Sequence, residues 1–295
     1  MRLYHFVVLT RPANIITAIA DILAGAAIAG IEISSIHLMQ FENLLLLMLS
    51  TIGLYGSGVV LNDAFDAELD KKERPERPIP TGLVSRTEAF AFGFTLMSLG
   101  IYSAFLFSTF SGVIAVIVAL MILLYDGLAK HHIVFGPLVM GLCRGGNLLL
   151  GMSIIPGSIH EFGFMALIPI IFIAAITLTS RGEVLGNNKL SLMLALSLDF
   201  VVIGFLAGLG IYNVLDLLSM VAFLTFWAFL NIRAKLAAIA NTGPENVKRA
   251  VKTGVISLIP LDASYAAGFG GFLFGMVVLA LLPLSLFLAK RFAVT

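Results

Sequence analysis

Three aspartates are spaced so that they would share one face of a helix. Asp63, Asp66 and Asp70 stand at positions i, i+3 and i+7 in the stretch LNDAFDAELDKKERPERPIPTG, and helical residues at this spacing lie above one another. Stacked carboxylates repel each other unless a positive charge lies between them. Because Mg²⁺ typically binds one or two carboxylates together with phosphate oxygens and water, the spacing predicts a Mg²⁺ site for a phosphorylated substrate.

Four basic residues follow the third aspartate closely: Lys71, Lys72, Arg74 and Arg77. Ammonium and guanidinium groups bind phosphate oxygens, so they suit the phosphate charge that Mg²⁺ leaves unbalanced. The run KKERPER taken alone also fits a solvated loop whose charges only set the topology. For NDAFDAELD, at the end of an apolar run, a site is the better interpretation, because carboxylates are costly beside a bilayer.

The chain around this stretch has the composition of a membrane protein. Hydrophobic residues make up 59% of the 295 residues, charged residues only 12%, and the mean hydropathy is +1.04. A soluble domain of this size needs more charge to cover its surface. The net charge of +1 excludes a general electrostatic attraction to nucleic acid. The lone Cys143 excludes an intramolecular disulfide.

Nine apolar runs are long enough to span a bilayer, which takes about 17–20 residues. They lie near 13–33, 42–62, 88–108, 111–128, 133–155, 163–180, 190–211, 214–233 and 270–289. A tenth candidate, 246–267, begins with basic residues and contains Pro260 and Asp262, so it is either an interfacial amphipathic helix or a kinked crossing. Continuous apolar runs favour helices over a β-barrel. The predicted fold is all-α, a polytopic membrane bundle forming one domain over residues 1–295.

Lys and Arg gather in alternate connections between these runs. They lie at Arg2 and Arg11, at 71–86, at Lys130, at Arg181 and Lys189, and at 233–252. The intervening connections, near 34–41, 109–110, 156–162 and 212–213, contain none. By the positive-inside rule the N-terminus is cytoplasmic and the protein lies in the cell membrane. Lys290 and Arg291 would also be cytoplasmic with ten crossings, which favours ten over nine.

The same residues resemble the motifs of the UbiA superfamily of intramembrane aromatic prenyltransferases. The family's first signature, N-D-x-x-D-x-x-x-D, is matched at every position by Asn62 and the three aspartates, and RPIPTGLVSRTEA resembles the pattern that follows it. LTRPANIITAIADILAG is similar to the first helix, GLCRGGNLLLG to the fifth, and Tyr125 with Lys130 to a tyrosine–lysine element whose spacing here is one residue longer than usual. The resemblance covers about residues 8 to 265, with 246–267 as the ninth helix and 270–289 as an addition.

The resemblance implies a UbiA-like fold of nine core helices and a Mg²⁺-dependent reaction in the bilayer. An isoprenyl group would pass from an allylic polyprenyl diphosphate to an aromatic or other lipophilic acceptor. The catalytic residues implied are Asp63, Asp66, Tyr125 and Lys130, and the Mg²⁺ ligands implied are Asp63, Asp66 and Asp70. The substrate-binding residues implied are Asn14, Asn62, Lys71, Arg77, Arg144, Asn147 and Glu183.

The sequence departs from the family at the second acidic signature, where SRGEVLGNNK contains Glu183 as its only acid. This resembles the UbiA-like EboC branch, and it keeps open a catalytically reduced protein that binds or transports a prenylated or aromatic metabolite. The sequence also leaves Asp126 open, since it can border the substrates or cap a helix. Three acids within apolar runs, Asp21, Asp199 and Asp262, have no partner that the sequence identifies.

Overall fold

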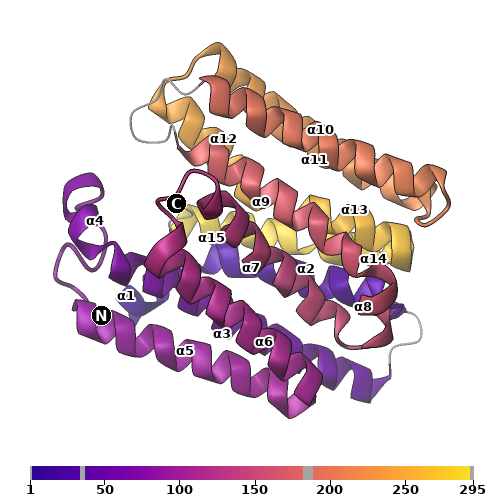
Figure 1. Ribbon diagram of the computed structural model, residues 1–295, viewed down its shortest axis with the longest axis horizontal. Coiled ribbons are helices and arrows are strands. Elements are labelled where there is room, and N and C mark those ends of the chain that lie inside the picture. The colour runs from indigo at the N-terminus through magenta and orange to yellow at the C-terminus, as the bar shows by residue number, and fades with distance from the viewer. Residues whose placement is uncertain (1, 34–36, 182–188, 293–295) are drawn as a thin grey trace.

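The structure, a computed structural model, describes residues 2–33, 37–181 and 189–292. In this part of the chain it consists of helices and their connections, without strands (Figure 1). The elements are α1 (Arg2–Leu9), α2 (Pro12–Ile28), α3 (Leu38–Phe65), α4 (Ala67–Glu73), α5 (Arg86–Phe107), α6 (Thr109–Leu124), the π-helix η2 (Tyr125–Ala129), α7 (Phe135–Met152), α8 (Gly157–Phe162), the 3₁₀-helix η3 (Gly163–Ala166), α9 (Leu167–Ser180), α10 (Lys189–Ile211), α11 (Leu217–Ala240), α12 (Pro244–Ile256), α13 (Leu258–Gly270), α14 (Phe272–Leu279) and α15 (Leu281–Arg291).

The predicted all-α membrane bundle is confirmed. Among the described residues, seven helical stretches are long and apolar enough to cross a membrane, or eight if the bent pair Leu3–Leu9 and Pro12–Ile28 counts as one span. The seven are α3, α5, α6 with η2, α8 through α9, α10, α11, and α14 with α15. The remaining predicted runs form α7 and the pair α12–α13. The count of nine spans with a tenth stays a prediction.

The segments predicted to be basic connections lie toward one end of the bundle. Figure 1 places α4, the N-terminus and the connection from α11 to α12 at the end opposite α8. The C-terminal segment returns to this end, where the rings of Tyr4 and Phe292 are 6.1 Å apart. The tenth run is broken between α12 and α13 at Ser257, so that Pro260 falls in the first turn of α13, where proline is tolerated.

Helix α2 is the central helix, and it packs against α3, α7, α13 and α15. Its sequence is rich in small residues, which let membrane helices approach closely. At Gly25 an added Cβ would lie 2.5 Å from the Leu148 carbonyl oxygen of α7, and at Gly151 it would lie 2.6 Å from the Ile22 carbonyl oxygen of α2. The two backbones are therefore in contact, which brings the polar side chains of α2 beside those of α7.

The intramembrane acids have hydrogen-bond partners, and for two of them the partner is on a neighbouring helix. Asp199 of α10 accepts hydrogen bonds from Lys235 of α11 at 2.6 Å on both of its oxygens, and both side chains are fully buried. Asp21 of α2 pairs with Arg144 of α7 at 2.5 Å. Asp262 of α13 accepts a hydrogen bond from Tyr265. The charges of Asp199 and Asp21 are thus each compensated by a basic side chain of a neighbouring helix, as an acid within a membrane requires.

We expect the two residues of the Asp199–Lys235 pair to be needed mainly because each neutralises the buried charge of the other. Removing one partner of a buried ion pair costs about 3–5 kcal/mol, whereas an apolar pair of similar volume is often tolerated. Asp199→Ala and Lys235→Ala should each lower the melting temperature of the detergent-purified protein strongly. The double variant Asp199→Leu/Lys235→Met should lower it less than either. A double variant less stable than both single variants would contradict this account.

Candidate active site

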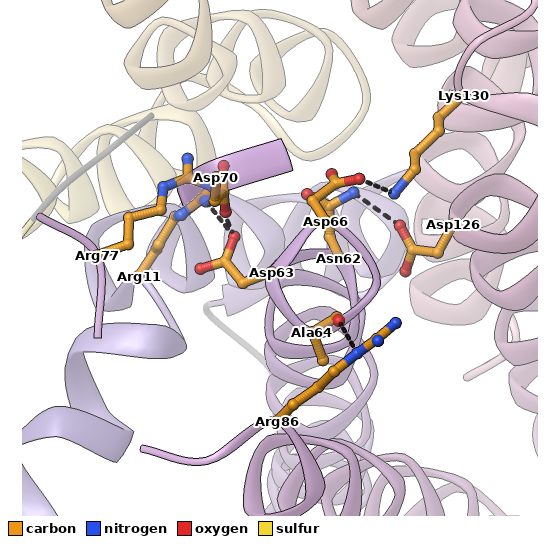
Figure 2. A network of polar contacts seen from close by, with 10 residues as sticks. All are labelled: Arg11, Asn62, Asp63, Ala64, Asp66, Asp70, Arg77, Arg86, Asp126 and Lys130. Atoms are coloured by element: carbon orange, nitrogen blue, oxygen red, sulfur yellow. Dashed lines mark hydrogen bonds and ion pairs between the residues drawn. The ribbon is translucent and has the colours of Figure 1, made fainter. Parts of the chain in front are cut away.

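The first acidic signature lies where α3 ends and α4 begins. Asp63 is in the last turn of α3, Asp66 is the junction between the helices, and Asp70 is in α4. The backbone stays nearly helical across the junction, since Asp66 N–H donates to the Asn62 carbonyl at 2.9 Å and Asp70 N–H donates to that of Asp66 at 2.8 Å. Even so, the three carboxylates do not share one face, contrary to the helical prediction. Asp63 and Asp70 point to one side and Asp66 to the other (Figure 2).

Two arginines hold the pair on the first side. Arg11 Nη2 lies 2.7 Å from Asp63 Oδ1, and Arg77 Nη1 lies 3.0 Å from the same oxygen and 2.8 Å from Asp70 Oδ2 (Figure 2). Both carboxylates are only 4% exposed. Hydrogen bonds between charged groups are about twice as strong as neutral ones, so Arg77 ties the loop after α4 to the end of α3.

Two irregular segments bring these arginines to the carboxylates. Arg11 connects α1 to α2, which meet at 52°, and its backbone is left-handed, with φ 46°. Its position before Pro12 disfavours the helical conformation there. In the loop after α4, Gly82 has φ +76°, which favours glycine, and Val84 N–H donates to the Pro78 carbonyl at 3.1 Å. The loop therefore folds back and returns Arg77 to the site.

The second side of the signature faces η2. Lys130 Nζ lies 2.5 Å from Asp66 Oδ1, and Asn62 Nδ2 donates to Asp126 Oδ1 at 2.8 Å (Figure 2). The π-helical turn explains the long spacing of the tyrosine–lysine element. Lys130 N–H donates to the Tyr125 carbonyl five residues earlier, at 3.0 Å, so the turn absorbs one extra residue. Lys130 consequently lies one helical turn beyond Tyr125. In an α-helix, the residue at that place would be four positions after the tyrosine.

A cavity of about 310 Å³ opens beside these residues. Its polar lining near the signature includes Arg11, Asn62, Arg74, Tyr125 and Asp126. Its apolar lining comes from α3, α6, α7, α9, α12 and α13 and includes Leu54, Val118, Ile122, Ile173, Ile176 and Leu258. The lining along α3 runs from Asn62 back to Thr51, which is roughly 16 Å at 1.5 Å per residue. The cavity is thus long, polar beside the signature and mostly apolar beyond it.

A second polar group lines the cavity away from the aspartate signature. Asn147 Oδ1 accepts from the Thr51 hydroxyl at 2.6 Å, and Asn147 Nδ2 donates to Asp21 at 2.8 Å. The Arg144 guanidinium lies 5.7 Å from the centre of the Tyr55 ring. Asn14, Arg144 and Asn147 were all predicted to bind substrate, and all three line the cavity. The partners of Arg144 and Asn147 are Asp21, Thr51 and carbonyls of α2, however, not the aspartates of the signature.

One predicted residue lies away from the cavity, one falls outside the described residues, and several cavity residues, Arg11 among them, were not predicted as site residues. Lys71 forms an exposed ion pair with Glu68 at 2.8 Å, and this hydrogen bond lowers the pKa of the Glu68 carboxyl. Glu183 lies outside the described residues. Arg11 was noted as a basic residue near the N-terminus and as part of a first-helix motif, but not as a site residue, although an Arg-Pro sequence before an apolar run signals a helix break beside a charged residue.

The donor set fits a Mg²⁺ ion that arrives with a phosphorylated ligand. In the described part of the chain, no three His, Cys, Asp or Glu side chains are close enough together to hold a metal, because each signature carboxylate faces a basic side chain. Asp63 and Asp70 nevertheless share one Arg77 nitrogen. Since Mg²⁺ needs only one or two carboxylates beside phosphate oxygens, these two suffice once the arginines turn to the phosphate.

A comparison with known protein families identifies this chain. Residues 19–243 match the model of the UbiA prenyltransferase family. The chain belongs to this family. The expectation drawn from the aspartate signature is therefore confirmed, and the UbiA match includes α3, the signature, η2 and α7.

Individual UbiA-type relatives match over shorter lengths. The digeranylgeranylglyceryl phosphate synthase of Methanosarcina mazei is 37% identical over 127 residues, 43% of this chain and 42% of that protein. The synthase of the same name from Methanoregula boonei is 33% identical over 173 residues, 58% of this chain and 57% of that protein. The chain thus spans about half the length of these relatives.

The fold is also similar to that of a solved UbiA homolog. The structure of the homolog from Archaeoglobus fulgidus bound to GPP and Mg²⁺ superposes with a TM-score of 0.64 at 13% identity, over 94% of this chain and 99% of that one. This likeness extends the UbiA fold to almost the whole chain.

We expect Arg77 to hold the loop after α4 in place when no ligand is bound. Arg77→Gln removes a charged donor from two buried carboxylates, and such hydrogen bonds contribute about 1.5–3 kcal/mol each. Amide hydrogen exchange in residues 66–84 should therefore accelerate about tenfold or more. Lys71→Gln, which removes only the exposed pair with Glu68, should leave exchange unchanged. Equal exchange in the Arg77 variant and the wild type would show that the loop does not depend on this contact.

Proposed function

We propose that this protein is an intramembrane prenyltransferase that moves an isoprenyl group from an allylic polyprenyl diphosphate to an aromatic or other lipophilic acceptor. The observation that carries the proposal is the complete N-D-x-x-D-x-x-x-D signature, whose Asn62 lines one end of a cavity with a mostly apolar lining. Membership of the UbiA prenyltransferase family supports the same reaction. The diphosphate would lie at the signature and the isoprenyl chain along the apolar lining.

The basic residues of the signature suit the binding of a diphosphate. Arg11, Arg77 and Lys130 balance three carboxylates in the structure. In the complex, Asp63 and Asp70 would hold Mg²⁺, while the three cations turn from carboxylate to phosphate oxygens. Mg²⁺, when bound, supplies positive charge that stabilises the diphosphate leaving group.

The cavity also suits the later part of the reaction. Loss of diphosphate leaves an allylic carbocation, which aromatic faces stabilise by cation–π attraction. Tyr55 and Tyr125 both line the cavity. Leu54, Val118 and Ile122 line the apolar part, which excludes water from the cation and favours capture by the acceptor. The names of the relatives favour geranylgeranyl diphosphate as a donor and a glyceryl phosphate lipid as an acceptor.

We expect the purified protein to release diphosphate from allylic donors only with Mg²⁺ present. Geranyl, farnesyl and geranylgeranyl diphosphate would be offered with and without geranylgeranylglyceryl phosphate and 4-hydroxybenzoate as acceptors. Asp63→Asn and Asp66→Asn should each reduce release by about 100-fold or more, as loss of an electrostatic contact to the transition state does.

The control is Asp216→Asn, an exposed helix cap that Asn replaces well, and it should retain the wild-type rate. Tight donor binding without diphosphate release, with every acceptor tested, would instead favour the catalytically reduced protein that binds or transports a metabolite. The single acid Glu183 in the second signature would then account for the lost turnover.

We further propose that the protein lies in the cell membrane with both termini in the cytoplasm. The grouping of basic connections at one end of the bundle supports this orientation. A reporter that fluoresces only in the cytoplasm should be active when fused after residue 295. A reporter that is active only outside the membrane should work when inserted at Asn213, in the connection at the opposite end. The reverse pattern would refute the orientation.

A further inference from the structure

Asp126 is a buried carboxylate with no role in the reaction proposed above. It is 3% exposed and lines the cavity beside the signature. Its Oδ1 accepts a hydrogen bond from Asn62, but within the described residues its Oδ2 has no hydrogen-bond partner and the side chain has no ion pair. Asp63, Asp66 and Asp70 each face a basic side chain. A buried carboxylate without a counter-charge is costly, so this one calls for a ligand that carries positive charge.

The π-helical turn is what places Asp126 in the cavity. The turn runs from Tyr125 to Ala129, and π-turns of this kind are frequent at functional sites. It accommodates one extra residue between Tyr125 and Lys130 and still allows Lys130 to form its ion pair with Asp66. Asp126 does not cap a helix end, which is the alternative that the sequence left open, because its Oδ1 accepts from the Asn62 side chain on another helix.

The position of Asp126 complements the weak part of the UbiA pattern. The segment SRGEVLGNNK contains a single acid where the family has two or more aspartates. Asp126 lies on the same side of the signature as Asp66, with Asn62 and Lys130 between them (Figure 2). Of the four carboxylates, Asp126 is the one that lines the cavity, and Asp66 is its neighbour on the same side of the signature.

We infer that Asp126 is a ligand of a second divalent cation that accompanies the diphosphate, beside the one that Asp63 and Asp70 would hold, in the role that the depleted second signature does not fill. The inference rests on the proposed function, because it requires a metal–diphosphate complex in the cavity. Asp126 would supply its free Oδ2 to the cation, and Asn62 would fix the orientation of the carboxylate through Oδ1. Lys130 would remain available to the diphosphate.

The test is Mn²⁺ binding, measured from the electron paramagnetic resonance signal of the free ion. The detergent-purified protein would be titrated with Mn²⁺ in the presence of geranyl S-thiolodiphosphate, an unreactive donor analogue. All variants would carry Cys143→Ala, since this thiol also lines the cavity. Asp126→Asn should weaken Mn²⁺ binding about tenfold or more, and Asp216→Asn should leave it unchanged.

A second variant separates a ligand from a residue that only supports the fold. Asp126→Cys should also bind Mn²⁺ weakly but should gain affinity for Cd²⁺ over its parent, because thiolates prefer soft metals. Unchanged Mn²⁺ binding by Asp126→Asn would overturn the inference and leave the proposed function intact. So would weak Mn²⁺ binding without any gain for Cd²⁺. If the parent protein itself binds no Mn²⁺ with the analogue, the metal-dependent function fails instead.

Discussion

A carboxylate buried at the edge of a bilayer needs a cation beside it, and Asp63 has two, Arg11 and Arg77. Each arginine depends on a different interruption of regular structure. Arg11 reaches Asp63 because the helix breaks before Pro12. Arg77 reaches the same carboxylate because the loop after α4 turns back at Gly82. The break at Arg11–Pro12 and the turn at Gly82 thus serve the same end, which is to keep positive charge beside the aspartates.

Much of the fold could be predicted from the sequence because it rests on local signals. Each apolar run became a helix or a pair of helices, and Pro260 predicted the break in the α12–α13 segment. The grouping of charge at one end followed from the alternation of basic connections. The first signature was also readable, since its residues are adjacent in the chain and their chemistry is specific.

The rest of the site depends on contacts that spacing does not encode. The i, i+3, i+7 pattern predicted three carboxylates on one face, but the junction at Asp66 and the distant Lys130 direct that carboxylate away from its neighbours. The sequence shows one extra residue in the tyrosine–lysine element. It does not show that a π-helical turn accommodates this residue. The partner of Asp21 is 123 residues away in Arg144, and the close contact of α2 with α7 at Gly25 and Gly151 brings the two together.

The charge pattern of the cavity couples the metal to the substrate. Without a ligand, Arg11, Arg77 and Lys130 occupy the carboxylates, so a cation alone must displace them and leave them unpaired in a poorly hydrated site. A diphosphate alone would draw the same three side chains away and leave the aspartates unpaired. When both bind, every charge finds a partner of opposite sign. Because coupling free energies are reciprocal, the factor by which the diphosphate strengthens metal binding equals the factor by which the metal strengthens diphosphate binding. On the proposed function, the ion pairs of the free protein would thus make the binding of each ligand depend on the other.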